Sequence, residues 1–202
     1  MCCWPRNYQP DFVMNLLFAL VNVLVIGALA FSWWHRESTG QLRRLFWPAL
    51  LIKLSAGIAL GVLYATYYPG GDTWTYFDCG RALTEMARES PGAFLRTLFA
   101  QDETTVAAQL TELPPRALTM VKIVALVNLI THDNYWISSL YFSLLSFAGS
   151  WFLVGTIVQY NERLLKAAAI GFLFFPSAIF WGAGMLKESL AMAALSAPGG
   201  GG

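Results

Sequence analysis

The sequence predicts an all-α protein, a polytopic bundle of transmembrane helices with extracytoplasmic helices lying at the membrane interface. Of the 202 residues, 56% are hydrophobic and 12% are charged, whereas soluble domains average about 45–50% and about 25%. A mean hydropathy of +0.51 is too high for a disordered chain, which needs charge to stay solvated. Several segments with few or no charges also approach the length of about 20 residues that crosses a bilayer core.

Composition and charge exclude other classes of protein. The net charge is +1, from 13 basic and 12 acidic residues, so there is no basic field to hold nucleic acid. Cys2, Cys3 and Cys79 match neither a disulfide framework nor a metal-ligand spacing. His35 and His132 lie near predicted membrane edges without companion ligands, so the sequence predicts no metal site from them.

The first two predicted spans cover residues 12–34 and 46–68. The first has no charge and ends in a tryptophan pair, which is typical of headgroup depth. The second holds one charge, Lys53, near its predicted start. We expect the aliphatic stem of this lysine to reach back toward the interface and to place the ammonium there.

The long loop at 69–134 begins with a proline and two glycines that end the second span. From Asp72 onward, apolar residues recur at three- and four-residue steps, which predicts an amphipathic helix on the membrane surface. A second short interfacial helix is predicted around residues 94–99. Residues 117–131 are too few and too polar for a comfortable span, because they include Lys122 and Asn128, so we assign them to the interface as well.

Two further spans follow, at 135–160 and 167–181, and then a partial helix at 185–197. Pro176 lies near the far end of the second of these spans. Residues 1–197 are therefore predicted to form a single transmembrane domain, and residues 198–202 a Pro/Gly tail. Thirteen residues cannot span a membrane, so we interpret the end of the chain as a fragment or an artificial stop.

The arginines orient the chain. The loop between the first two spans holds three of them and one glutamate: Arg36, Arg43, Arg44 and Glu37. The positive-inside rule places this loop in the cytoplasm, which makes loop 69–134 extracytoplasmic. If residues 117–131 stay at the outer surface, Arg163 and Lys166 are also cytoplasmic; if they cross, both fall outside. We favour the first arrangement, in a multi-pass protein of the cytoplasmic (inner) membrane.

Asp72 is the first candidate for chemistry. It follows two glycines at a predicted helix start, where its carboxylate could act as a base or merely serve as the helix N-cap. Asp78 lies six residues on, about 600° around a helix, so the two carboxylates do not share a face. Asp78 is thus a candidate second acid only if the reaction uses one.

Lys187 and Glu188 form the second candidate, at the predicted outer end of a span. As neighbours on a helix they point about 100° apart and need different partners. Lys187 could bind a phosphate as a point charge, and Glu188 could hold a metal, a sugar hydroxyl or an arginine. The alternative is that both simply contact lipid headgroups.

Two stretches of sequence resemble the GT-C superfamily of multi-pass membrane glycosyltransferases: YYPGGDTWTYF after a span, and FLFFPSAIFWGAGMLKESLA at the outer end of a later one. The resemblance covers roughly residues 46–195. It implies transfer of a sugar from a polyprenyl-phosphate carrier to an acceptor on the outer face of the membrane. Asp72 would then be the catalytic acidic residue, with Lys187 and Glu188 near the carrier phosphate.

The partners expected on this reading are membrane lipid and a lipid-linked sugar donor. No metal-ligand set is predicted, although a divalent cation could take part. Two alternatives stay open: a non-catalytic membrane assembly subunit, and a transporter or flippase component of envelope polysaccharide synthesis. A transporter should have ionisable groups facing a midplane path and inverted repeats, whereas the sequence places its charges at the predicted membrane edges.

Overall fold

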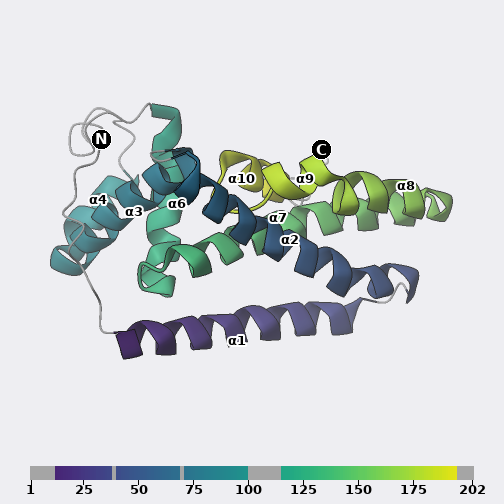
Figure 1. Ribbon diagram of the computed structural model, residues 1–202, viewed down its shortest axis with the longest axis horizontal. Helices are drawn as coiled ribbons and strands as arrows, with labels where there is room; N and C mark the ends of the chain where they lie inside the picture. The colour runs from purple at the N-terminus through teal and green to yellow at the C-terminus, as the bar shows by residue number, and fades with distance from the viewer. Residues whose placement is uncertain (1–11, 38–39, 69–70, 100–114, 195–202) are drawn as a thin grey trace. The chain divides into compact units, whose positions relative to one another are not determined.

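The computed structural model describes residues 12–37, 40–68, 71–99 and 115–194, and within these ranges every regular element is a helix (Figure 1). The predicted all-α fold class is confirmed. Three helices are long and apolar enough to cross a membrane: α1 (Phe12–Arg36), α2 (Gly40–Thr66) and α7 (Tyr135–Tyr160). The chain thus has the make-up of a membrane protein.

These three helices agree with the predicted spans, with one difference. α2 begins at Gly40, six residues before the predicted start at 46. The added turn and a half buries Leu42 next to Phe46, so packing extends the helix beyond its purely apolar part. Because of this extension, Lys53 lies thirteen residues from each end of α2 rather than near its start.

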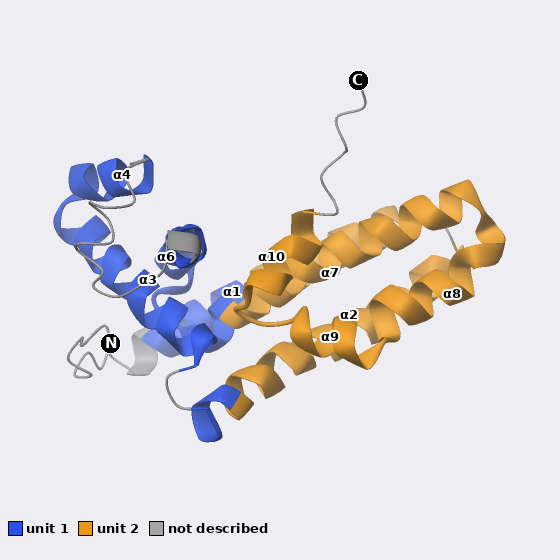
Figure 2. Cartoon of the chain, turned by 90° about the horizontal axis from the view of Figure 1, so that it is seen from above, with its two compact units in different colours: residues 1–22, 64–138 blue, residues 23–63, 139–202 orange. Residues whose placement is uncertain are grey.

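The chain divides into two compact units, and the division falls inside α1, α2 and α7 (Figure 2). Unit 1 comprises residues 1–22 and 64–138, and unit 2 comprises residues 23–63 and 139–202.

Unit 1 is built on α3 (Asp72–Glu89), which packs against α4 (Pro91–Phe99) and α6 (Pro115–Thr131). The predicted amphipathic face of α3 is real, because Tyr76, Cys79 and Leu83 are buried. Gly80 allows α6 to approach closely, since a Cβ there would lie 2.5 Å from Cγ1 of Val124. The short helix predicted around residues 94–99 is present as α4, and residues 117–131, assigned to the interface, lie in α6. The place of both segments at a membrane surface stays a prediction.

Unit 2 has a core of aromatic side chains from its three long helices. Trp33 of α1, Phe46 of α2, and Phe147 and Trp151 of α7 contact one another with ring centroids 5.0 to 5.8 Å apart. Most of these contacts are edge-to-face, which is the favoured arrangement of aromatic pairs.

Residues 167–181, predicted to cross the membrane, form several short pieces and not one helix, and their crossing of a membrane stays a prediction. After a 3₁₀ turn, η1 (Glu162–Leu164), come α8 (Leu165–Ala169), the π-helix η2 (Ile170–Phe174) and α9 (Pro176–Trp181). Phe175 has an extended backbone at φ −68° and ψ 122°, because a residue before proline is pushed out of the helical region. The last helix, α10 (Lys187–Ala194), begins two residues after the predicted start at 185, and the tail lies outside the described residues.

Candidate functional site

Asp72 is the first residue of α3, and Gly71, not Asp72, is the N-cap. The capping interpretation of Asp72 is therefore wrong by one position. Gly71 fits tightly, because a Cβ there would overlap the ring of Tyr64. The Asp72 carboxylate is exposed, and the hydroxyl of Tyr76 donates to its Oδ2 at 3.4 Å. A carboxylate in the first turn interacts favourably with the helix dipole, so this position keeps an accessible acceptor at the helix start.

The other predicted site residues are exposed as well. Asp78 lies on α3, and Lys187 and Glu188 are the first two residues of α10. Asp72 and Asp78 belong to unit 1, whereas Lys187 and Glu188 belong to unit 2. Their joint action on one lipid-linked donor stays a prediction.

The turn before Lys187 is anchored by two serine side chains. Residues 182–186 are buried, and Gly184 has a left-handed φ of 66°. Its amide donates to Oγ of Ser143 at 2.9 Å, and its carbonyl accepts from Oγ of Ser189 at 2.7 Å. Irregular backbone at membrane depth is tolerated where protein satisfies it, and here serine side chains do so.

Lys53 does not reach the interface as predicted. Its residue is only 4% exposed, and its ammonium donates to the carbonyl of Ala178 at 2.9 Å. That carbonyl lies in the last turn of α9, where carbonyls lack partners within their own helix. Gly182 makes room, because a Cβ there would lie 2.8 Å from Nζ of Lys53. A lysine at the centre of a spanning helix is costly and is by default a candidate for function.

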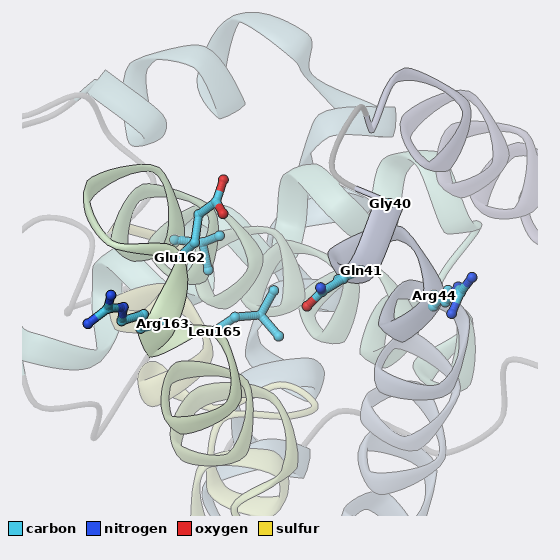
Figure 3. A pocket seen from close by; sticks show the side chains of 7 residues that line it. Gly40, Gln41, Arg44, Glu162, Arg163 and Leu165 are labelled. Carbon is cyan, nitrogen blue, oxygen red and sulfur yellow. The ribbon is translucent and has the colours of Figure 1, made fainter.

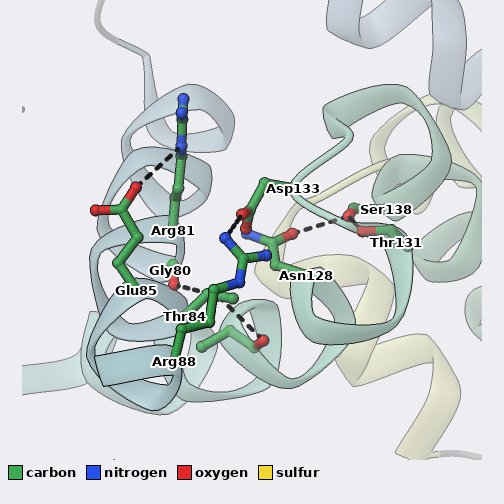
Figure 4. A network of polar contacts seen from close by, with 10 residues as sticks. Gly80, Arg81, Thr84, Glu85, Arg88, Asn128, Thr131, Asp133 and Ser138 are labelled. Carbon is green, nitrogen blue, oxygen red and sulfur yellow. Dashed lines mark hydrogen bonds and ion pairs between the residues drawn. The ribbon is translucent and has the colours of Figure 1, made fainter. Parts of the chain in front are cut away.

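Unit 1 contains a partly buried ionic cluster that the sequence did not indicate (Figure 4). Arg88 of α3 forms an ion pair with Asp133 at 2.8 Å, and about two turns earlier on the same helix Arg81 lies 3.8 Å from Glu85. The side chain of Asp133 is 3% exposed, whereas that of Arg88 is 37% exposed. The carboxylate is thus inside the unit and the guanidinium reaches it from the surface.

Asn128 and Ser138 extend this cluster. The hydroxyl of Ser138 donates to Oδ1 of Asn128 at 2.8 Å and lies 2.7 Å from that of Thr131. The Nδ2 of Asn128 is buried and has no hydrogen-bond partner in the described part of the chain. An unsatisfied buried donor of this kind is uncommon in folded proteins.

The link from α6 to α7 holds Asp133 in place. His132 and Asp133 both have left-handed φ angles, 55° and 57°, a conformation that costs non-glycine residues energy. The amide of Asp133 donates to the carbonyl of Asn128 at 3.1 Å, which satisfies the end of α6. Asn134 then caps α7, since its Oδ1 accepts from the amides of Trp136 and Ile137.

Burial raises the pKa of the Asp133 carboxyl, although Arg88 lowers it in part. Burial also raises the pKa of Glu85. Perturbed carboxyls of this kind are found at functional sites more often than elsewhere. Asp133 can therefore hold a proton at a higher pH than an exposed aspartate. The one signal for it in the sequence is its position between two apolar segments.

Neither a metal centre nor a known relative identifies the site. Among the described residues, no group of three or more His, Cys, Asp or Glu side chains could hold a metal ion. The chain matches no protein-family model, no curated protein and no solved structure.

Proposed function

We propose that the chain is part of a membrane glycosyltransferase that moves a sugar from a polyprenyl-phosphate carrier to an acceptor on the outer face of the cytoplasmic membrane. In this proposal Asp72 accepts the proton of the acceptor hydroxyl, and Lys187 offsets charge on the departing phosphate. Glu188 lies beside the carrier, and Asp78 is the reserve acid.

The observation that carries the proposal is the setting of Asp72. Its carboxylate is exposed in the first turn of a helix that follows directly on a candidate span. A base at that position can meet both a lipid-linked donor at the membrane surface and an acceptor from water. The half-buried Trp74, stacked on Tyr135 at 3.8 Å, adds an aromatic wall of the kind found in ligand sites.

Unit 2 supports the orientation within this proposal. Arg44, near the start of α2, and Arg163, just after α7, line the same cavity. The two arginine-bearing loops therefore lie at one end of the unit, as the positive-inside rule requires if both are cytoplasmic. An impermeant maleimide added from outside should label a single cysteine placed at Gly92. It should not label a cysteine placed at Gly40 or Asn161, and the reverse pattern would refute the orientation.

The test of catalysis compares two exposed carboxylates on the same helix. Asp72→Asn keeps the side-chain size but removes the base, so sugar transfer in membranes should fall about 100-fold or more. Glu89→Gln, at the last residue of α3, removes the same charge and should leave transfer unchanged. Full activity of the Asp72→Asn protein would move the catalytic role away from Asp72.

Lys53 is the specific observation that favours the alternative of a transporter or flippase component. Broken helices and buried charge at the middle of the membrane are features of transporters. Lys53 lies at the middle of α2 and donates to a carbonyl of α9, one of the short helices of the divided segment. The test measures movement of a lipid-linked sugar across the membrane of vesicles that contain the protein. If this movement stops in the Lys53→Met protein and continues in the Asp72→Asn protein, transport is favoured over sugar transfer.

A further inference from the structure

A cavity of about 690 Å³ lies at one end of unit 2, between the first turns of α2 and the connection from α7 to α8 (Figure 3). Its side-chain lining comes from these segments: Gln41, Arg44, Val158, Glu162, Arg163 and Leu165. The cavity has no role in the sugar transfer proposed above.

The position of the cavity fixes its depth in a membrane. Gly40, which also lines it, is the first residue of one candidate span, and Val158 is two residues from the end of another. The ends of spanning helices lie where the hydrocarbon core meets the headgroups. A ligand in this cavity would therefore sit at the depth of lipid phosphates.

The lining is apolar on one side and cationic at the rim. Val158 and Leu165 are hydrophobic, and in Figure 3 Arg44 and Arg163 lie on opposite sides of the cavity, with both guanidinium groups turned away from it. Both arginines are exposed, so their guanidinium groups are free to turn toward a ligand. Guanidinium groups bind phosphate oxygens in pairs of parallel hydrogen bonds. Glu162 is the one acid among the described lining residues.

The loops that flank the cavity carry a surplus of positive charge. Residues 35–44 and 161–166 hold five arginines and lysines against two glutamates. One of these glutamates, Glu37, accepts a hydrogen bond from the indole of Trp151 at 3.0 Å and is thus engaged within the unit. Such a surplus attracts anionic lipid more strongly than zwitterionic lipid.

We propose that this cavity binds the headgroup of an anionic phospholipid, with Arg44 and Arg163 on the phosphate and Gln41 within reach of headgroup hydroxyls. The apolar residues receive the first carbons of the lipid below the phosphate. A soluble anion would make no use of Val158 and Leu165, which is why lipid is the occupant that fits.

The test titrates dioleoyl phosphatidylglycerol into the full chain in a neutral maltoside detergent and counts bound lipid by native mass spectrometry. Each basic residue near an anionic surface contributes about 1 kcal/mol, so Arg44→Gln and Arg163→Gln should each weaken binding about fivefold and together about 30-fold. Glu162→Gln should strengthen it about fivefold by the same reasoning.

Arg43→Gln is the matched control. The Arg43 guanidinium lies 4.2 Å from the centre of the Trp34 ring and does not line the cavity, so affinity should stay as in the parent chain. The proposal is overturned if the double variant binds as tightly as the parent. It is equally overturned if phosphatidylcholine binds as well as phosphatidylglycerol, or if millimolar inorganic phosphate displaces the lipid.

Discussion

Units 1 and 2 bury their charged groups in different ways. In unit 1 the buried carboxylate of Asp133 is paired with the guanidinium of Arg88 at 2.8 Å. In unit 2 the buried ammonium of Lys53 donates to a neutral backbone carbonyl, that of Ala178. Removal of one partner of an ion pair leaves the other charge buried without compensation. Removal of a lysine that donates to a backbone carbonyl leaves only a neutral carbonyl without its hydrogen bond.

The difference shows what each unit can tolerate. The ion pair of unit 1 opens to water through the partly exposed Arg88, so its charges are only partly desolvated. Unit 2 contains most of the residues of the three candidate spans, and backbone groups inside a membrane must be satisfied internally. There α9 ends at Trp181, the Ala178 carbonyl in its last turn lacks a partner within the helix, and Lys53 supplies the donor.

The largest effect should follow from Arg88→Met, because it leaves the Asp133 carboxylate buried without its cation. We expect unit 1 to lose about 3 kcal/mol of stability against local opening. Cys79 reports this directly: it is fully buried, and with Cys2 and Cys3 replaced by serine it is the one thiol of the chain. Its rate of labelling measures the opening.

Asp133→Asn is the comparison for this prediction. It leaves Arg88 unpaired, but a side chain that is 37% exposed can turn into water, so the loss should be clearly smaller than for Arg88→Met. If the two variants label Cys79 equally fast, the carboxylate is not the uncompensated partner.

A second test concerns helix packing in unit 2. A Cβ at Gly149 of α7 would overlap the carbonyl of Met192 in α10 and lie 2.6 Å from its carbonyl carbon. Gly149→Ala should therefore cost about 1–3 kcal/mol, although alanine is the better helix former. The buried Ser146, replaced by cysteine in a chain without other cysteines, serves as the labelling reporter.

Gly155→Ala is the matched control for Gly149. It lies on the same helix with no neighbouring atom within 4 Å of the added Cβ. This change should leave unit 2 as stable as before, or stabilise it by up to about 1 kcal/mol. Equal losses in both variants would show that α7 and α10 are not in close contact at Gly149.

Lys53→Met should have a smaller effect than Arg88→Met, and this is the sharpest test of the contrast between the units. It removes a buried charge and leaves only the Ala178 carbonyl without its donor, so the cost should be at most about 1 kcal/mol. Labelling of the cysteine at position 146 measures it. A cost as large as that of Arg88→Met would show that Lys53 does more than satisfy a carbonyl.

The smallest effect is a pH dependence confined to unit 1. Burial raises the pKa of Asp133 above the usual value of about 4, so between these two pKa values the folded unit binds more protons than the unfolded chain. Its stability should then fall as pH rises from about 4 through the pKa of the folded state. In the Asp133→Asn protein, the stability of unit 1, measured by labelling of Cys79, should depend less on pH. The pH dependence that Glu85 contributes should remain.

The sequence predicted the long helices well, because their signal is local. The spans at 12–34 and 135–160 correspond to α1 and α7 within two residues. The helix from Asp72 was likewise recognisable from its apolar spacing, since Tyr76, Cys79 and Leu83 form its buried face. Length and periodicity are properties of the segment itself, so they can be read without its neighbours.

The candidate residues were less predictable. Lys53 was expected at an interface because the start of α2 was placed six residues too late, and packing of Leu42 decided that boundary. Asp133 and Arg88 are 45 positions apart in the sequence, and nothing in either segment indicates the other. Their pairing depends on how α3 packs against α6.

The sequence by itself determined that the described part of the chain is helical, with three helices long and apolar enough to span a membrane, because apolar length and composition suffice for that. Only the tertiary structure decided which polar groups are buried and what satisfies them: Lys53 with a backbone carbonyl, Asp133 with a guanidinium, and the turn at Gly184 with two serines. The physical reason is that burial and hydrogen-bond partners are supplied by segments distant in sequence, whereas helix formation is governed by residues three and four positions apart.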